Sequence, residues 1–352
     1  MNAVTQPRPR VEAKPSLIEL VHEQATNVFA ASAHPTVKGR VRDGRWEDVL
    51  LGPVNDILGR PGKAIRACLV EAGYAMVHPG ESAPNAALAL VEILHAGSLV
   101  IDDIEDDSKT RRGGKCLHRV YGVPKTLNAG NFMYFLAVRQ IEELALAPAT
   151  ALALYRLVNR TLLDCHRGQA LDLGLHLGDV SQSEVATVVA ETSLLKTGAL
   201  TALATGMGAL IAGGSDAQVE ATTKFGRELG LALQQLDDLG NLSGKGPAAK
   251  RYEDLRNGRL TWPWAWAAEI LSPLEYQNME AVARALQGAG HGLRPNARAL
   301  AEALLRVAGE HRRHFIVHRL RGSLGELAAQ FPEGSEVDRL RELIDLLETS
   351  YG

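Results

Sequence analysis

The sequence predicts an all-α fold in the form of a large helical bundle. Apolar residues recur three and four positions apart along most of the chain, as in residues 90–101 and 154–165, and this is the spacing of one helix face. Ala and Leu dominate, while the alternating β-branched or aromatic residues of strands are scarce. Many helical segments exceed the roughly 11–12 residues of an average helix. We therefore expect central helices that are buried on most sides.

Turn-forming segments interrupt this helical pattern, but no linker divides the chain into two domains. The chain has 352 residues, of which 46% are hydrophobic and 22% charged, enough for one large core. Residues 1–15 hold three prolines and no apolar run, so we expect a flexible N-terminal tail followed by a single domain over residues 16–352. No run reaches the about 18–20 uninterrupted apolar residues of a membrane span, so no transmembrane segment is expected.

Charge and cysteine content exclude several classes of protein. Thirty-eight basic against forty-one acidic residues give a net charge of −3, without the basic stripe of a nucleic-acid-binding protein. Cys68, Cys116 and Cys165 are too widely spaced for a zinc site or a disulfide framework. This cysteine usage is typical of a reducing compartment, so we expect a cytoplasmic protein.

An acidic cluster stands at the end of one strongly apolar helical run. In the sequence LVIDDIEDDS, Asp102 and Asp106 are four positions apart and share a helix face, with Asp103 beside them. Carboxylates this close repel one another unless a cation lies between them, and Mg²⁺ prefers such oxygen ligands. The alternative is a solvated acidic helix end, which is less favourable because helix C-termini disfavour negative charge.

A second cluster repeats the offsets of the first. Asp237, Asp238 and Asn241 occupy offsets 0, +1 and +4, again after an apolar run. Carboxylates from facing helices of a bundle build metal sites in other proteins. The pair of clusters therefore predicts a Mg²⁺ site between two helix ends.

Basic residues accompany both clusters. Arginine and lysine at such positions suit the oxygens of a diphosphate, and Lys196 interrupts an apolar stretch where an unpaired charge is costly. The candidate diphosphate ligands are Lys63, Arg66, Arg111, Arg112, Lys196, Lys250 and Arg259. Each alone is an ordinary surface charge, and their placement beside the clusters is what points to a diphosphate.

With these residues the sequence resembles the trans-isoprenyl diphosphate synthases, the polyprenyl synthetase family. The motifs occur in the family's order: GKxxR (62–66), a histidine at 95, DDxxD (102–106), RRG (111–113), HRGQALDL (166–173), KTGAL (196–200), QxxDDxxN (234–241) and DLRNGRLTWP (254–263). The resemblance covers residues 50–270, and it is greatest to geranylgeranyl diphosphate synthases. It implies a bundle of the isoprenoid synthase type with a central active-site cavity.

The resemblance also implies the activity. It is a head-to-tail prenyltransfer in which isopentenyl diphosphate condenses with an allylic diphosphate primer, with Mg²⁺ as three ions per site and a homodimer as the assembly. Alternatives that stay open are a synthase of another product length, farnesyl or longer, a terpene cyclase on the same scaffold, and a regulatory subunit. Intact aspartates argue against the subunit, and residues for a second diphosphate argue against the cyclase.

Roles follow from the resemblance for each matching position. The metal ligands and their supports would be Asp102, Asp103, Asp106, Asp237, Asp238 and Asn241, the last replacing a more common aspartate. The allylic diphosphate would be held by Arg111, Lys196 and Lys250, with Arg259 near them. Isopentenyl diphosphate would be held by Lys63, Arg66, His95 and Arg112. Thr197, Gln234 and Asp172 would line the reacting centre.

Product length depends on the residues before and beside the first cluster. Gly97 and Ser98, both small, lie about one turn before Asp102 and would leave a tunnel open for a product longer than farnesyl. Candidate floor residues are Phe132, Met133 and Phe135, with ordinary core as the competing interpretation. His118, the charged stretch 311–322 and the tryptophans at 262, 264 and 266 are interpreted as structural.

Overall fold

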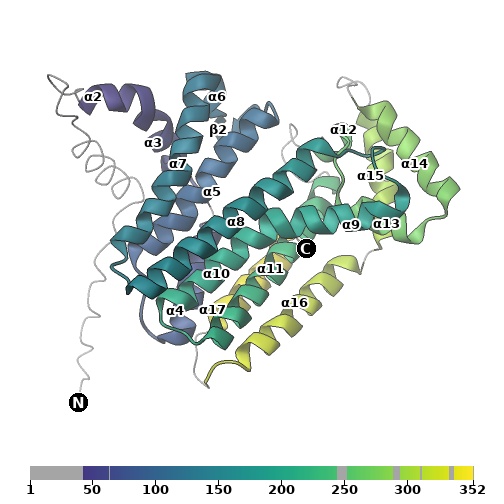
Figure 1. Ribbon diagram of the computed structural model, residues 1–352. Helices are drawn as coiled ribbons and strands as arrows, with labels where there is room; N and C mark the ends of the chain where they lie inside the picture. Colours follow the sequence, from purple (N-terminus) through teal and green to yellow (C-terminus); the bar gives the residue numbers. More distant parts are fainter. Residues whose placement is uncertain are drawn as a thin grey trace, which may run out of the picture. The chain divides into compact units, whose positions relative to one another are not determined.

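The protein is represented by a computed structural model that describes residues 43–62, 64–243, 252–287, 294–309, 311–332 and 337–351 (Figure 1). These residues are helical almost throughout, which confirms the predicted all-α class. The chain divides into two compact units. The first comprises Met1–Lys63 and Pro84–Glu143, and the second comprises Ala64–Ala83 and Leu144–Gly352. The predicted tail, residues 1–15, lies outside the described residues, and the single domain over 16–352 stays a prediction.

The first unit is built on two long helices and a small hairpin. Its elements are α2 (Asp43–Trp46), η1 (Glu47–Leu51), α3 (Gly52–Gly59), α5 (Asn85–Glu105), β1 (Thr110–Arg111), β2 (Gly114–Lys115), α6 (Leu117–Tyr121) and α7 (Val123–Glu143). Helix α5 packs along α7, and α3 contacts α5, α6 and α7. The short antiparallel hairpin β1–β2 leads from the end of α5 into α6.

Two glycines let α5 and α7 approach closely. A Cβ on Gly97 would stand 3.0 Å from Met133 Cβ and 3.2 Å from the Gly130 carbonyl oxygen. A Cβ on Gly130 would stand 2.7 Å from Ile101 Cδ1. Gly97 is therefore small because the backbone of α7 passes beside it, and not because a tunnel opens there.

The second unit contains the remaining helices. They are α4 (Ile65–Val77), α8 (Pro148–Gly174), α9 (Gln182–Ser193), η2 (Leu194–Gly198), α10 (Ala199–Ile211), α11 (Asp216–Leu242), α12 (Glu253–Arg256), α13 (Trp262–Ile270), α14 (Pro273–Leu286), α15 (Arg294–Ala308), α16 (Arg312–Ala328) and α17 (Asp338–Tyr351). Serine capping boxes start three of them, at Ser181, Ser215 and Ser272.

Helix α10 is the centre of the second unit. It packs against α4, α8 and α11, and its residues from 199 to 209 are all buried. Small residues make this possible, since a Cβ on Gly73 of α4 would lie 2.2 Å from the Thr205 carbonyl oxygen. By length and composition, the helical run Gln182–Ile211 is the one described helix that satisfies the criteria for a membrane span. A buried core helix satisfies them equally, and 67% of its most apolar window is buried.

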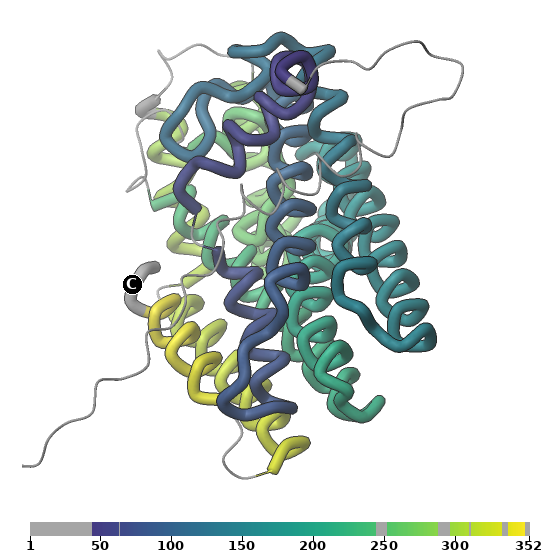
Figure 2. The backbone as a smooth tube through the Cα atoms, turned by 90° about the vertical axis from the view of Figure 1, so that its left-hand side faces the viewer, coloured from purple at the N-terminus to yellow at the C-terminus, as the bar shows by residue number. Residues whose placement is uncertain are grey.

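The region after residue 270 completes the same unit. Helices α14 and α15 (green in Figure 1) share an apolar cluster with α9 and α13 that includes Trp264, Tyr276 and Leu304. Helices α16 and α17 (yellow in Figure 2) pack side by side, and Arg321 pairs with Asp345 and Glu348 between them. Trp264 and Trp266 are buried, in agreement with their interpretation as packing residues.

Candidate active site

The first acidic cluster lies at the C-terminal end of α5. The helix continues to Glu105 and the Asp106 amide donates to the Asp102 carbonyl at 2.9 Å, so these two aspartates share a helix face as expected. Asp103 is buried at 2% exposure, Asp102 is half-buried and Asp106 is exposed. The cluster therefore offers two carboxylates toward solvent and a third held inside the fold.

Arg111 neutralises the buried member of this cluster. Its Nε and Nη2 donate to Asp103 Oδ1 at 2.8 and 2.6 Å, and Nη2 also lies 3.3 Å from Asp102 Oδ2. Burial alone would lower the pKa of Arg111, but hydrogen bonding and charge from Asp103 outweigh it and raise the pKa. Arg111 thus belongs to the carboxylate cluster as well as to the predicted diphosphate ligands.

The hairpin carries its second arginine in a strained conformation. Arg112 and Gly113 have φ of 50° and 79°, the two positive values that a two-residue type I′ turn requires. A left-handed conformation costs a non-glycine residue about 1–2 kcal/mol. The guanidinium of Arg112 lies over Gly62, since a Cβ there would stand 3.2 Å from its Cζ. Burial lowers the pKa of Arg112.

The second cluster lies near the end of α11 and divides into an exposed and a buried acid. Asp237 is exposed, while Asp238 accepts Gln234 Nε2 and the Trp262 amide, each at 2.8 Å. Burial, and then the charge of Asp254, raise the pKa of Asp238 well above its usual range. Asp238 therefore supports the site from inside, and Asp237 is the member that a cation can reach from solvent.

A π-helical turn carries Thr197, which is linked to this cluster, and Lys196 beside it. The turn η2 interrupts the run from α9 to α10, and such bulges occur frequently at functional sites. Thr197 Oγ1 donates to Gln234 Oε1 at 2.8 Å, which links it through Gln234 to Asp238. The Trp262 indole donates to Ser193 Oγ at 2.9 Å and closes the network from α13.

Asp172 joins two of the predicted cations. Its Oδ2 accepts Lys196 Nζ at 2.5 Å, its Oδ1 lies 2.9 Å from Arg259 Nη1, and the same Nη1 donates to its carbonyl at 2.8 Å. Burial alone would raise the pKa of Asp172, but Lys196 and Arg259 outweigh it and hold the pKa below its usual range. The HRGQALDL, KTGAL and DLRNGRLTWP motifs thus meet at one carboxylate.

Asp254 belongs to the same site and was not among the residues predicted from the sequence. Burial, followed by the charges of Asp237 and Glu253, raises its pKa to about 7. The signal that could have found it is its place in the DLRNGR segment, four residues after Lys250 and five before Arg259. Its charged neighbours become apparent only once α11 and α12 are brought together.

The acidic residues fit divalent cations that complete their coordination elsewhere. In the second unit, burial and then the charges of Asp237 and Glu253 raise the pKa of Asp254, so a cation bound near this carboxylate would favour its ionised form. Within the described parts of the chain, no three acidic, His or Cys side chains converge closely enough to chelate an ion alone. Such sites suit Mg²⁺, which usually takes one or two carboxylates together with water and phosphate oxygens.

Backbone strain gathers in the same motif segments. Five of the described non-glycine residues have positive φ: Ala64 lies in GKxxR, Arg112 lies in RRG, Asp107 directly follows DDxxD, Tyr252 stands two residues before DLRNGRLTWP, and Ala145 lies elsewhere. Left-handed residues persist where the surrounding structure holds them, and they cluster at ligand-binding sites. Four of these five positions therefore lie in, or within two residues of, the segments that the sequence predicts to bind substrate and metal.

The predicted residues thus fall into two groups. The first unit carries His95, Asp102, Asp103, Asp106, Arg111 and Arg112, and the second carries Arg66, Asp172, Lys196, Thr197, Gln234, Asp237, Asp238, Asn241 and Arg259. Lys63 and Lys250 lie outside the described residues. The predicted meeting of the two acidic clusters around shared ions stays a prediction.

Of the candidate floor residues, only some are placed to line an interior. Met133 is fully buried against Gly97, and Phe132 is half-buried. Phe135 is 75% exposed, which argues against its assignment as a floor residue. Ser98 is half-buried and donates to the His95 carbonyl at 2.8 Å.

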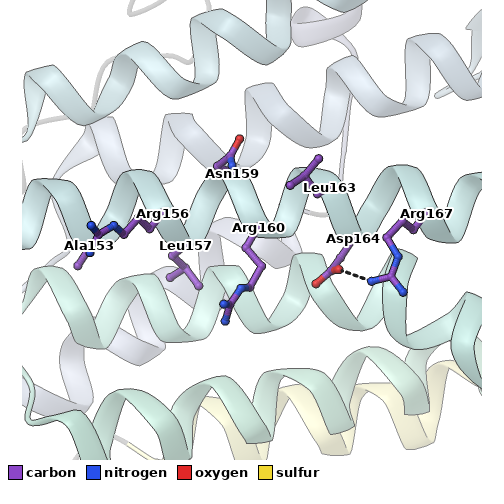
Figure 3. A pocket seen from close by; sticks show the side chains of 8 residues that line it. All are labelled: Ala153, Arg156, Leu157, Asn159, Arg160, Leu163, Asp164 and Arg167. Carbon is purple, nitrogen blue, oxygen red and sulfur yellow. Dashed lines mark hydrogen bonds and ion pairs between the residues drawn. The ribbon is translucent and has the colours of Figure 1, made fainter.

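An open groove of about 760 Å³ runs along α8, lined by side chains of that helix alone (Figure 3). Arg156, Arg160 and Leu163 lie along it, and Arg167 donates to Asp164 at its end. None of the predicted substrate or metal ligands lines this groove. It is therefore a surface feature distinct from the candidate active site.

Comparison with known proteins assigns the class that the fold and the site define. The sequence matches the Polyprenyl synthetase family over residues 47–290. The chain belongs to this family, as the motifs predicted.

Its relatives include fungal enzymes. The chain is 34% identical over 224 residues to a geranylgeranyl pyrophosphate synthase of Penicillium ochrochloron, covering 63% of this chain and 60% of that protein. It is 34% identical over 229 residues to geranylgeranyl pyrophosphate synthase 2 of Zymoseptoria tritici, covering 62% and 64%. The matches therefore span about six tenths of the length of these relatives.

Solved structures share the fold. A geranylgeranyl pyrophosphate synthase structure superposes with a TM-score of 0.74 at 20% identity, covering 94% of this chain and 98% of the other. A polyprenyl synthase from Caulobacter crescentus, complexed with calcium and isoprenyl diphosphate, gives 0.71 at 21% identity, covering 96% and 98%. These likenesses support the isoprenoid synthase fold predicted from the motifs.

The raised pKa of Asp254 predicts how the stability of the metal-free protein depends on pH. Between about pH 4 and 7 the folded state retains a proton that the unfolded chain has released, so the free energy of unfolding falls as pH rises. The Tm of the wild-type protein in EDTA should decrease from pH 5 to 7.5. The Tm of Asp254→Asn should decrease less steeply over the same range. Added Mg²⁺ should also flatten the wild-type slope. Equal slopes for the two proteins in EDTA would contradict the assignment.

Proposed function

We propose that the protein is a Mg²⁺-dependent trans-prenyltransferase that condenses isopentenyl diphosphate with an allylic diphosphate to make geranylgeranyl diphosphate. One observation carries this proposal. Motif residues from distant parts of the sequence meet in the Asp172–Lys196–Arg259 network, which joins three of the family's segments in one place. An ordinary set of surface charges would not converge in this way.

The proposed chemistry begins with ionisation of the allylic substrate. Breaking its carbon–oxygen bond leaves negative charge on the diphosphate, and fixed cations stabilise that charge most when it develops in the transition state. When bound at Asp102, Asp103, Asp106 and Asp237, Mg²⁺ would supply additional positive charge to the leaving group. Arg111, Lys196 and Lys250 are the proposed direct protein contacts.

The residues of the second unit are arranged to orient Lys196 and Thr197. Asp172 holds the Lys196 ammonium at 2.5 Å while Arg259 anchors Asp172 from the other side. Gln234 holds the Thr197 hydroxyl at 2.8 Å and is itself held by Asp238. The proposed role of Thr197 and Gln234 is to turn oxygen dipoles toward the developing carbocation.

Isopentenyl diphosphate is proposed to bind to Lys63, Arg66, His95 and Arg112 without metal. Its double bond attacks the allylic cation, and a proton then leaves the condensed product. The released diphosphate is the proposed base for that proton. Arg112 supports this assignment because its strained backbone fixes a guanidinium beside Gly62, the first residue of the GKxxR motif.

Relatives support the product proposed. The fungal proteins that match the chain carry the name geranylgeranyl pyrophosphate synthase, and the Caulobacter crescentus structure holds calcium and isoprenyl diphosphate. A divalent cation and an isoprenoid diphosphate are what the acidic and basic clusters of this chain fit. The rival products, farnesyl and longer polyprenyl diphosphates, differ only in chain length.

We further propose a homodimer that acts in the cytoplasm. On α8, Leu152 and Leu163 are 50% and 60% exposed beside the groove, and on α7 Leu127 and Phe135 are also exposed. Apolar side chains in this number on long helices are typical of faces that another protein covers. A second copy of the chain is the proposed occupant.

The metal assignment predicts the effect of removing either cluster's leading aspartate. Asp102→Ala and Asp237→Ala should each lower kcat by roughly 10²–10³-fold, because charge stabilisation in the transition state is lost. The measurement is turnover of labelled isopentenyl diphosphate with each allylic primer and Mg²⁺. Glu326→Ala, which removes an exposed acid paired with Lys224, is the control and should keep wild-type turnover. Near-wild-type activity in either aspartate variant rejects the assignment.

The product-length proposal predicts a shorter product from Ser98→Phe. An aromatic ring one turn before Asp102 should block elongation, so chromatography of the products should show farnesyl in place of geranylgeranyl diphosphate. Phe135→Ala is the control, because its exposed ring should leave chain length unchanged. An unchanged product from Ser98→Phe means that the chain grows along another path.

The homodimer proposal predicts that a charge on α8 weakens assembly. Leu163→Glu should shift the mass measured by light scattering from two copies toward one, because a charge at a buried interface is costly. Leu274→Glu changes an equally exposed leucine on α14 and should leave the mass unchanged. A wild-type protein that is already monomeric would overturn the proposal.

A further inference from the structure

Arg60, which stands before the GKxxR motif, joins α3 to the arginine hairpin. Its Nη1 donates to the Arg111 carbonyl oxygen at 2.9 Å, and its Nε donates to Asp56 Oδ1 at 2.8 Å. The Arg60 side chain is 12% exposed. One guanidinium therefore ties the backbone of the hairpin to a carboxylate one turn earlier on α3.

The same carboxylate is held from the far side of the hairpin. Tyr121, at the end of α6, donates its hydroxyl to Asp56 Oδ2 at 3.1 Å. Both oxygens of Asp56 are thus engaged, one by Arg60 and one by Tyr121. The hairpin lies between these two attachments in the sequence, so Asp56 is a shared anchor for the segments before and after it.

The hairpin leaves room for the Arg60 guanidinium at one position. A Cβ on Gly114 would stand 3.0 Å from both Cζ and Nη1 of Arg60. Gly114 is the cross-strand partner of Arg111, whose carbonyl Arg60 binds. The absence of a side chain at Gly114 therefore leaves the space that the Arg60 guanidinium occupies.

We propose that Arg60 is a positioning residue for the type I′ turn, and through it for the isopentenyl diphosphate ligand Arg112. The inference rests on the proposed role of Arg112. Nε and Nη1 of Arg60 donate to Asp56 and to the Arg111 backbone, so we assign Arg60 to the hairpin and not to the substrate. Its task is to hold the strained turn that aims Arg112.

The two hairpin arginines depend on Arg60 to different degrees. The Arg111 side chain is held separately by its bonds to Asp103 and Asp102. Arg112 follows directly after the carbonyl that Arg60 binds, and its φ of 50° persists only while the turn is held. Loss of Arg60 should therefore disturb isopentenyl diphosphate binding more than binding of the allylic primer.

The test compares Arg60→Met with wild type in steady-state kinetics and in amide hydrogen exchange. Arg60→Met should raise the KM for isopentenyl diphosphate about 10-fold, within the roughly 10²-fold that a 1 Å misplacement can cost. The KM for the allylic primer and kcat should stay within about 3-fold of wild type. Exchange of the amides in residues 110–115 should become faster. Arg60→Lys keeps a donor and the charge, so its KM for isopentenyl diphosphate should lie between those of Arg60→Met and wild type.

Two controls separate positioning from a general loss of charge or of packing. Arg139→Met removes a half-buried arginine of the same unit that pairs with Glu142, and it should change neither KM nor hairpin exchange. Gly114→Ala should raise the same KM in wild type and add nothing in the Arg60→Met background. Additive effects of the two substitutions would show that they act independently.

The outcomes distinguish this inference from the proposed function. If the wild-type protein shows no prenyl transfer, the proposed function is rejected. The amide exchange of residues 110–115 in Arg60→Met then still tests whether Arg60 holds the hairpin. If the wild-type protein is active but Arg60→Met changes neither the KM for isopentenyl diphosphate nor the amide exchange, only the positioning role of Arg60 is overturned. An equal rise in both KM values without faster exchange also overturns it, because that pattern reports only the loss of a positive charge.

Discussion

Carboxylates that are crowded together at a helix end must be compensated by positive charge, and much of the structure described here follows from how each one is compensated. Arg111 compensates Asp103 and reaches Asp102, while Lys196 and Arg259 compensate Asp172. Asp238 takes hydrogen bonds in place of a cation. Burial and the nearby charge of Asp237 raise the pKa of Asp254, and a divalent ion bound near this carboxylate would favour its ionised form.

Several of the residues proposed to bind the substrates or to compensate the carboxylates lie on irregular backbone. The π-helical turn at residues 194–198 carries both Lys196, which binds Asp172, and Thr197, which binds Gln234. Arg111 ends β1 and Arg112 begins the two-residue turn, so the side chain of Arg111 returns to the aspartates while that of Arg112 lies over Gly62. The strain of that turn requires an anchor, and Arg60 with Asp56 is in place to provide it.

The scaffold and the chemistry are supported by different kinds of likeness. Solved structures with TM-scores near 0.7 at about 20% identity share the helical architecture, which by itself is compatible with several reactions and product lengths. The polyprenyl synthetase match over residues 47–290 includes every motif that builds the candidate site. The proposed chemistry therefore rests on the side chains of these motifs, and the helices supply the frame that positions them.

The sequence alone determined the helical class, the family and the residues of both acidic clusters, because helical periodicity and motif spacing are local properties of the chain. It could also place Asp102 and Asp106 on one face, since four residues make about one turn. Tertiary packing decided the rest. Gly97 proved to be a helix contact, Phe135 proved to be exposed, and Asp254 acquired a pKa of about 7, since each depends on neighbours distant in sequence. Arg60 is the clearest case, because an arginine's partner 51 residues away has no local signature.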